Sequence, residues 1–70
     1  MMYNHFHKNL KRLRKRHGLT QQAFAEKFKG IDRNNISAWE NEAEPAYFRL
    51  IQIAEFFGLT TDQILKEEIL

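Results

Sequence analysis

Apolar residues recur at helical spacing in successive short windows of this chain, and Gly or Pro stands between most of the windows. In the first window, residues 5–17, the apolar positions Phe6, Leu10 and Leu13 fall on one face of a helix. Gly18 follows directly and predicts the end of that helix, because glycine readily adopts the left-handed conformation that a helix C-terminus favours.

The second window is shorter and predicts a helix of about two turns. Thr20 is placed as its N-cap, and its buried stripe consists of Phe24, Ala25 and Phe28. Lys29 and Gly30 end the pattern. Because a third helix begins shortly afterwards, the sequence predicts two short helices joined by a tight, glycine-containing turn, which is a helix-turn-helix arrangement.

The third window begins at Asp32, whose carboxylate can accept from the free N–H groups of a helix start. Around the helical wheel, one side carries Ile36, Trp39 and Glu40, and the other carries Asn34, Ser37, Ala38 and Asn41. The second side is small and polar, whereas an ordinary solvated helix face carries Lys and Glu pairs. Since amides and hydroxyls hydrogen-bond to base edges in the major groove, this pattern predicts a DNA recognition helix.

The last two windows also have helical periodicity. After a connector at residues 42–45, whose Pro45 suits a helix entry, the apolar positions of a fourth helix are Tyr47, Leu50, Ile51, Ala54 and Phe57. Gly58 ends this helix, and Thr60 caps a fifth that carries Ile64 and Leu65. No window alternates as a strand would, so the sequence predicts an all-α fold of five helices.

Length and composition set limits on what the chain can do. Seventy residues make one domain, here residues 1–70, and 43% hydrophobic content is ample for a folded core. Cysteine is absent, so neither disulfides nor a thiolate zinc site is expected, and a cytoplasmic location is favoured. No apolar run approaches the roughly 20 residues that span a membrane, and nothing reads as a signal peptide.

Charge is distributed unevenly, although the net charge is only +2. Residues 1–20 hold six basic residues and no acidic one, whereas residues 41–70 hold two basic and six acidic residues. The basic end has the charge pattern of a polyanion binder. The alternative is a solvated basic helix that only keeps the protein soluble.

Neither a metal centre nor an active site is indicated. His5 and His7 are two positions apart, so they diverge by about 200° around a helix, and His17 lies at its far end. The chain has no cysteine nucleophile, no glycine-rich phosphate loop and no glycine-framed serine. We therefore expect no metal, no cofactor and no catalysis.

Several spaced motifs, taken together, resemble the Cro/C1-type (Xre-like) helix-turn-helix domain of phage repressors. In chain order they are Leu13-Arg14, Gly18-Leu19-Thr20-Gln21, Phe24-Ala25, Ile36-Ser37, Trp39-Glu40-Asn41, Pro45 and Ala54-Glu55-Phe56-Phe57-Gly58-Leu59. The resemblance covers roughly residues 8 to 65. It implies a five-helix, lambda-repressor-like DNA-binding domain with its helix-turn-helix motif at about residues 20–41.

The resemblance also implies roles for individual residues. Base contacts are expected from Arg33, Asn34, Asn35 and Ser37, with Asn34 reading adenine and Arg33 reading guanine or touching a phosphate. Phosphate contacts are expected from Lys11, Arg14, Thr20, Gln21, Gln22 and Asn41, and Gln21 also braces the recognition helix. Arg14 and Glu40 match a buried salt bridge between the first and third helices.

Three departures from the family pattern bear on these roles. Lys29 looks like a one-residue insertion before the recognition helix. Glu42 replaces the usual glycine, so that Asn41 or Glu42 must supply any left-handed cap. The connector from Glu42 to Glu44 is acidic where the family is often basic, which leaves more of the phosphate attraction to Lys11, Arg12 or Lys27.

The sequence therefore predicts a sequence-specific DNA-binding domain, and specifically a small transcriptional repressor that binds a double-stranded operator as a homodimer. A dimer is expected because one recognition helix discriminates only about four base pairs. The candidate residues for self-association are Phe48, Phe56, Ile69 and Leu70. The alternative for Phe48 and Phe56 is that they are half-buried residues of the core. The alternative is a regulator whose main partner is a protein, such as an antitoxin, since the C-terminal half is acidic.

Overall fold

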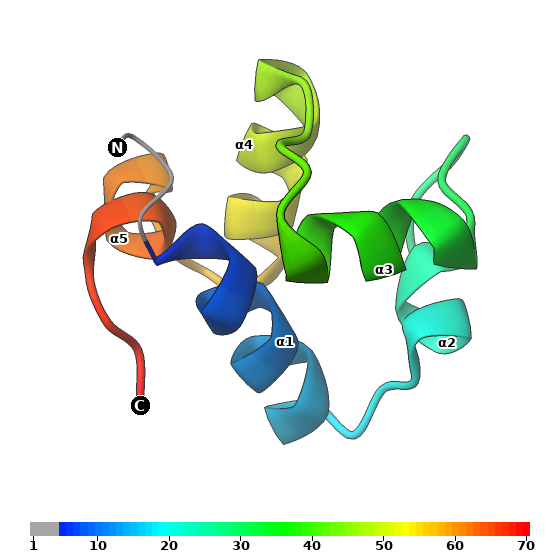
Figure 1. Ribbon diagram of the computed structural model, residues 1–70, viewed down its shortest axis with the longest axis horizontal. Helices are drawn as coiled ribbons and strands as arrows, with labels where there is room; N and C mark the ends of the chain where they lie inside the picture. Colours follow the sequence, from blue (N-terminus) through cyan, green and yellow to red (C-terminus); the bar gives the residue numbers. More distant parts are fainter. Residues whose placement is uncertain (1–4) are drawn as a thin grey trace.

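The computed structural model describes residues 5–70, and within them the fold is all-helical, as expected. The five helices are α1 (Phe6–Arg16), α2 (Gln21–Ala25), α3 (Arg33–Asn41), α4 (Tyr47–Phe56) and α5 (Thr61–Lys66) (Figure 1). Residues 5–70 contain no strand, and none of their helices combines the length and apolar character that a membrane crossing requires.

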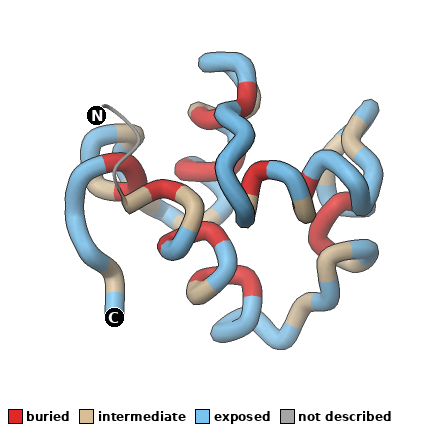
Figure 2. Tube along the Cα trace, viewed as in Figure 1, coloured by how far each residue is buried: buried red, intermediate tan, exposed pale blue. Residues whose placement is uncertain are grey.

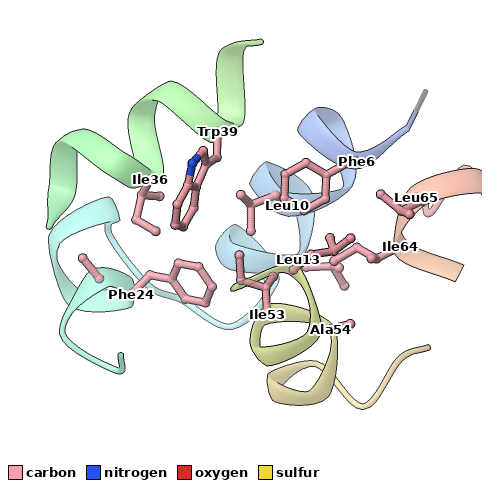
Figure 3. Close-up of a cluster of buried hydrophobic side chains, with 12 residues drawn as sticks. Phe6, Leu10, Leu13, Phe24, Ile36, Trp39, Ile53, Ala54, Ile64 and Leu65 are labelled. Atoms are coloured by element: carbon pink, nitrogen blue, oxygen red, sulfur yellow. The ribbon is translucent and has the colours of Figure 1, made fainter. Parts of the chain in front are cut away.

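Helix α1 lies between α3 and α5, so that its two sides meet different partners (Figure 1). Its buried residues Phe6, Leu10 and Leu13 form the centre of the core. Figure 3 shows Ile36 and Trp39 reaching this centre from α3, while Ile64 and Leu65 reach it from α5. Helix α2 packs against α3 and contributes Phe24, which is completely buried. The core therefore holds the helix-turn-helix pair against α1.

Two helices end in the same way, at a glycine with a positive φ angle. After α1, Gly18 has φ 68°, the Gly18 N–H donates to Lys15 O at 2.9 Å, and the Leu19 N–H donates to Arg14 O at 3.2 Å. Gly58 has φ 72° and ends α4 with the same pair of hydrogen bonds. These two hydrogen bonds form the Schellman motif, in which a side chain at the left-handed position would strain the backbone. The helix ends predicted at Gly18 and Gly58 are therefore confirmed.

Helix α2 is shorter than the predicted two turns. Beyond Ala25 the backbone tightens, because the Lys27 N–H bonds to Phe24 O at 3.0 Å and the Phe28 N–H bonds to Ala25 O at 3.1 Å. These are i→i−3 bonds, which continue a helix only as a tight turn. Phe28 is half-buried and packs edge-on against Phe24, with ring centroids 5.1 Å apart. The side chain thus follows the expected stripe although the α-helix has already ended.

The predicted apolar stripe of α4 was wrong at its first position. Leu50 and Ala54 are buried as predicted, and so is Ile53, which the predicted stripe omitted, whereas the Tyr47 residue is 63% exposed. The first turn of α4 projects beyond the end of α3 in Figure 1, and Figure 2 shows much of this projecting turn as exposed. Tyr47 has the correct helical phase, but the neighbouring helices do not reach it. Helical phase alone therefore did not determine burial.

Helix α3 ends without a left-handed cap. Gly18, Gly30 and Gly58 are the residues with positive φ within residues 5–70. Helix α3 instead ends at Glu42 with φ −147°, and the N–H groups of Glu42 and Ala43 both donate to Ala38 O. Neither Asn41 nor Glu42 therefore supplies a left-handed cap, and the chain leaves α3 in a right-handed or extended conformation.

Asn9 connects α1 to the C-terminal end of the chain, a role that no sequence pattern indicated. Its side chain is completely buried, and its Nδ2 donates to Ile64 O at 2.8 Å and to Glu67 O at 2.7 Å. Its Oδ1 accepts from the Ile69 N–H at 3.0 Å. The Arg12 guanidinium donates to Ile69 O at 3.0 Å, so this residue, expected to attract phosphate, is directed toward the C-terminal tail, residues 67–70.

Candidate nucleic-acid interface

The start of α3 is closed by a reciprocal pair of hydrogen bonds. The Asp32 carboxylate accepts from the Asn35 N–H at 3.0 Å, which confirms Asp32 as the predicted N-cap. In return, Asn35 Oδ1 accepts from the Asp32 N–H, also at 3.0 Å. This is a capping box in which Asn takes the place usually held by Glu or Gln. Its consequence is a helix start whose geometry is fixed by two side chains.

The capping box limits what Asn35 can offer to DNA. Recognition of adenine by an asparagine uses both atoms of the amide, since Oδ1 accepts from the base N6 group and Nδ2 donates to N7. In this structure Asn35 Oδ1 is already directed at the Asp32 N–H. Only the Nδ2 group of Asn35 is left for a base while the box is closed. Asn34 does not have this restriction.

The two faces of α3 differ in burial as the wheel predicted. Ile36 is completely buried and Trp39 is 8% exposed, whereas Arg33, Asn34 and Ala38 are exposed. The side chains of Arg33 and Asn34 make no hydrogen bond or ion pair with any residue in the described range 5–70. Ser37 is half-buried at the edge of this surface. The outer face of α3 therefore presents polar groups that are free to bind.

The inner face of α3 is held by an ion pair with α1. Arg14 Nε lies 2.5 Å from Glu40 Oε2, and Arg14 Nη2 donates to Glu40 Oε1 at 3.1 Å. The two side chains are 8% and 4% exposed. The remaining nitrogen, Arg14 Nη1, donates to Leu19 O at 2.7 Å. Since every nitrogen of the guanidinium has an internal partner, the expectation that Arg14 contacts phosphate is corrected: its place is inside the domain.

The other residues expected at phosphate lie along the start of α2 and on α1 and α3. Gln21 Nε2 donates to Glu40 Oε1 at 3.1 Å, which joins α2 to the Arg14–Glu40 pair. Thr20 Oγ1 accepts from the Ala23 N–H at 3.0 Å, as an N-cap should. Gln22 and Lys11 are exposed. Asn41 is also exposed and donates to Ser37 O at 2.9 Å within its own helix.

Charge changes sign along α3. At its N-terminal end the exposed basic residues Lys27, Lys29 and Arg33 outnumber the exposed acidic residues Glu26 and Asp32, and the helix dipole is also positive there. Glu42 and Glu44 are exposed just after its C-terminus, where the dipole is negative. A polyanion is therefore attracted to the N-terminal end of α3, near Arg33 and Asn34, and repelled from its C-terminal end.

A sequence model of the family described as "Helix-turn-helix" matches residues 10–64, which is well over half of the chain. This chain belongs to the helix-turn-helix family. The resemblance to the Cro/C1-type group is thereby confirmed. No solved structure matched the chain.

A curated relative from Bacillus subtilis (strain 168), described as the uncharacterized HTH-type transcriptional regulator YqaE, is 42% identical to this chain over 64 residues. The alignment covers 90% of this chain and 54% of the relative. The chain thus spans about half the length of the curated relative that it matches.

Proposed function

We propose that this helix-turn-helix chain binds a specific double-stranded DNA operator through α3 and acts in the cytoplasm as a transcriptional repressor. The observation that supports this most directly is the division of α3 into two faces. Arg33 and Asn34 are exposed and unpartnered, while the buried Glu40 holds the opposite face against α1. A rigid helix with free amide and guanidinium groups on its outer side suits the major groove.

Asn34 is proposed as the principal base reader, with both amide atoms directed at an adenine. Arg33 pairs with guanine or with the phosphate beside it, and Ser37 and the Asn35 Nδ2 group complete the base-facing set. Lys11, Thr20, Gln21, Gln22 and Asn41 are proposed to contact phosphates. These phosphate contacts set the register of the protein on the duplex, whereas the base contacts set its sequence preference.

A homodimer is proposed because one copy reads too short a sequence. Good bidentate base contacts contribute about 1 to 3 kcal/mol each, and one helix spans about four base pairs. Two copies on half-sites roughly one helical turn apart would double the length that is read. Exposed apolar side chains that could join two copies are Phe48 at 58%, Phe56 at 37% and Leu70 at 78% exposed, while Ile69 is half-buried.

The proposal is tested by selecting bound duplexes from a random DNA library and measuring the affinity of the selected duplex across a range of salt concentrations. We expect a palindrome with half-sites about one turn apart and an affinity that falls steeply with salt, because bound phosphates release counterions. If no duplex is enriched, or if the protein binds all duplex sequences equally well, the operator-binding function is contradicted.

A second function, binding to a protein partner, is favoured by one surface. The acidic connector residues Glu42 and Glu44 are exposed directly before Tyr47 and Phe48, whose aromatic side chains are also exposed. Acidic groups repel phosphate, so this end of the molecule suits a protein better than DNA. An apolar protein complex would keep its affinity as salt rises, whereas the DNA complex would lose it.

A further inference from the structure

The C-terminal half of α3 is anchored to α1 at a second point besides the Arg14–Glu40 pair. His7 Nδ1 lies 2.8 Å from Trp39 O, across 32 positions of sequence, in a partly buried contact. A carbonyl oxygen can only accept, so Nδ1 must carry a hydrogen and donate it. The His7 ring also packs edge-on against Phe6, with centroids 5.6 Å apart, which holds the ring in place.

Trp39 O is one of the carbonyl groups that a helix end leaves without an intrahelical partner. The Ala43 N–H, which would bond to Trp39 O in a continuing helix, donates to Ala38 O instead at 3.0 Å. His7 therefore caps α3 from another helix. Such a cap acts directly on the backbone of α3, whereas Arg14 acts through the rotatable side chain of Glu40.

We propose that His7 is a positioning residue for the recognition helix. His7 and Arg14 are seven positions apart on α1, which separates their backbone positions by about 10 Å along the helix axis. Their side chains hold neighbouring residues of α3, Trp39 and Glu40. Two anchors at different heights on α1 fix the angle at which α3 crosses it. That angle sets where Arg33 and Asn34 point, and in this respect the inference rests on the proposed DNA-binding function.

The test compares His7→Asn with His7→Leu. The Asn Nδ2 group stands the same number of bonds from the backbone as His Nδ1 and can donate, whereas Leu has a similar shape and no donor. His7→Phe serves as a second variant without a donor, because it keeps an aromatic ring against Phe6. Each variant is studied at a temperature where circular dichroism shows it to be fully folded.

Without DNA, residual dipolar couplings of the backbone N–H groups report the orientation of α3 relative to α1. We expect the Leu and Phe variants to reorient α3 and to shift the Trp39 carbonyl carbon resonance, and the Asn variant to resemble the wild type. If α3 keeps its orientation in both variants without a donor, the positioning role of His7 is overturned, whatever the Trp39 resonance and the DNA results are.

With the selected operator, we expect the Leu and Phe variants to bind about threefold to tenfold more weakly, the range that one net hydrogen bond supports, and Asn to restore binding. Discrimination at the base read by Asn34 should fall in parallel, which a simple loss of stability would not cause. A wild-type protein that selects no operator would contradict the proposed function and leave the DNA-free result to decide the role of His7.

Discussion

Each side of α1 carries one buried polar side chain that bonds to a neighbouring part of the domain, and these two side chains use different chemistry. On the α5 side, Asn9 is neutral and bonds three backbone groups. On the α3 side, Arg14 is charged and requires the carboxylate of Glu40. Helix α5 and the C-terminal tail are thus bonded to α1 by a neutral amide, whereas α3 is bonded to α1 by an ion pair.

The two arrangements differ in the free energy that burial costs and in how strictly each holds the neighbouring helix. A buried ion pair gains little over an apolar pair, because desolvation of both charges offsets their attraction. It nevertheless penalises any geometry that separates the charges, which suits a helix whose angle matters. The Asn9 amide is satisfied by backbone groups without burying a net charge, and none of the buried side-chain nitrogen or oxygen atoms within residues 5–70 lacks a partner.

The largest effect should come from Glu40→Ala. This change leaves the buried Arg14 charge unpaired, and we expect the free energy of unfolding to fall by about 3 to 5 kcal/mol in urea denaturation. Glu42→Ala is the matched control, since Glu42 is exposed just beyond the end of the same helix. A loss below about 1 kcal/mol would mean that Arg14 does not depend on Glu40 in solution.

Replacing both partners sharpens the comparison. Arg14→Met combined with Glu40→Leu removes the charges together, and we expect a stability within about 1 kcal/mol of the wild type. If the ion pair fixes the angle of α3, this stable double variant should still bind the selected operator more weakly. Unchanged operator affinity would show that the pair has no role in orienting α3.

The next effect should come from Asn9→Leu, which has a similar shape and no polar atoms. Three backbone groups lose their partner, and we expect a destabilisation of about 2 to 3 kcal/mol because the tail can move aside and regain water for some of them. Hydrogen exchange at the Ile69 amide should accelerate, since its N–H donates to Asn9 Oδ1. Unchanged exchange at Ile69 would contradict the role assigned to Asn9.

The side-chain amide of Asn35 also hydrogen-bonds to the backbone, but at the surface of the domain. Its loss should therefore reduce the stability less than the loss of Asn9 does. Asn35→Ala opens the capping box, and we expect a loss of about 1 kcal/mol in the free energy of unfolding. Because only the Nδ2 group of Asn35 is left for a base, discrimination at one base pair should fall by less than it does in Asn34→Ala. Base preferences that stay unchanged at every position would remove Asn35 from the base-reading set.

The smallest effect on stability should come from Asn34→Ala, within about 0.5 kcal/mol, since the side chain is exposed and unpartnered. Its effect belongs to recognition: discrimination at one position of each half-site should fall by about 1 to 3 kcal/mol. Competition between the operator and single-base variants measures this directly. Preserved discrimination at every position would remove Asn34 from the base-reading set.

The sequence by itself determined the helices and most of their ends, because those features depend on neighbouring residues. Apolar spacing located the helices, and Gly18, Gly58, Thr20 and Asp32 marked helix ends through local backbone and capping chemistry. Neighbouring residues did not predict two local features. An i→i−3 turn replaces the second turn of α2, and Asn35 takes the capping position that Glu or Gln usually holds.

Only the tertiary structure decided which distant groups the polar side chains would meet. Asn9 and Ile64 are 55 positions apart, and His7 and Trp39 are 32 apart. Family resemblance suggested the Arg14–Glu40 pair, but it did not show that Leu19 O occupies the rest of the Arg14 guanidinium. Helical periodicity indicates which face of a helix turns inward. It does not give the crossing angles that bring a particular donor to a particular carbonyl group, because those angles are set by the packing of all the helices together.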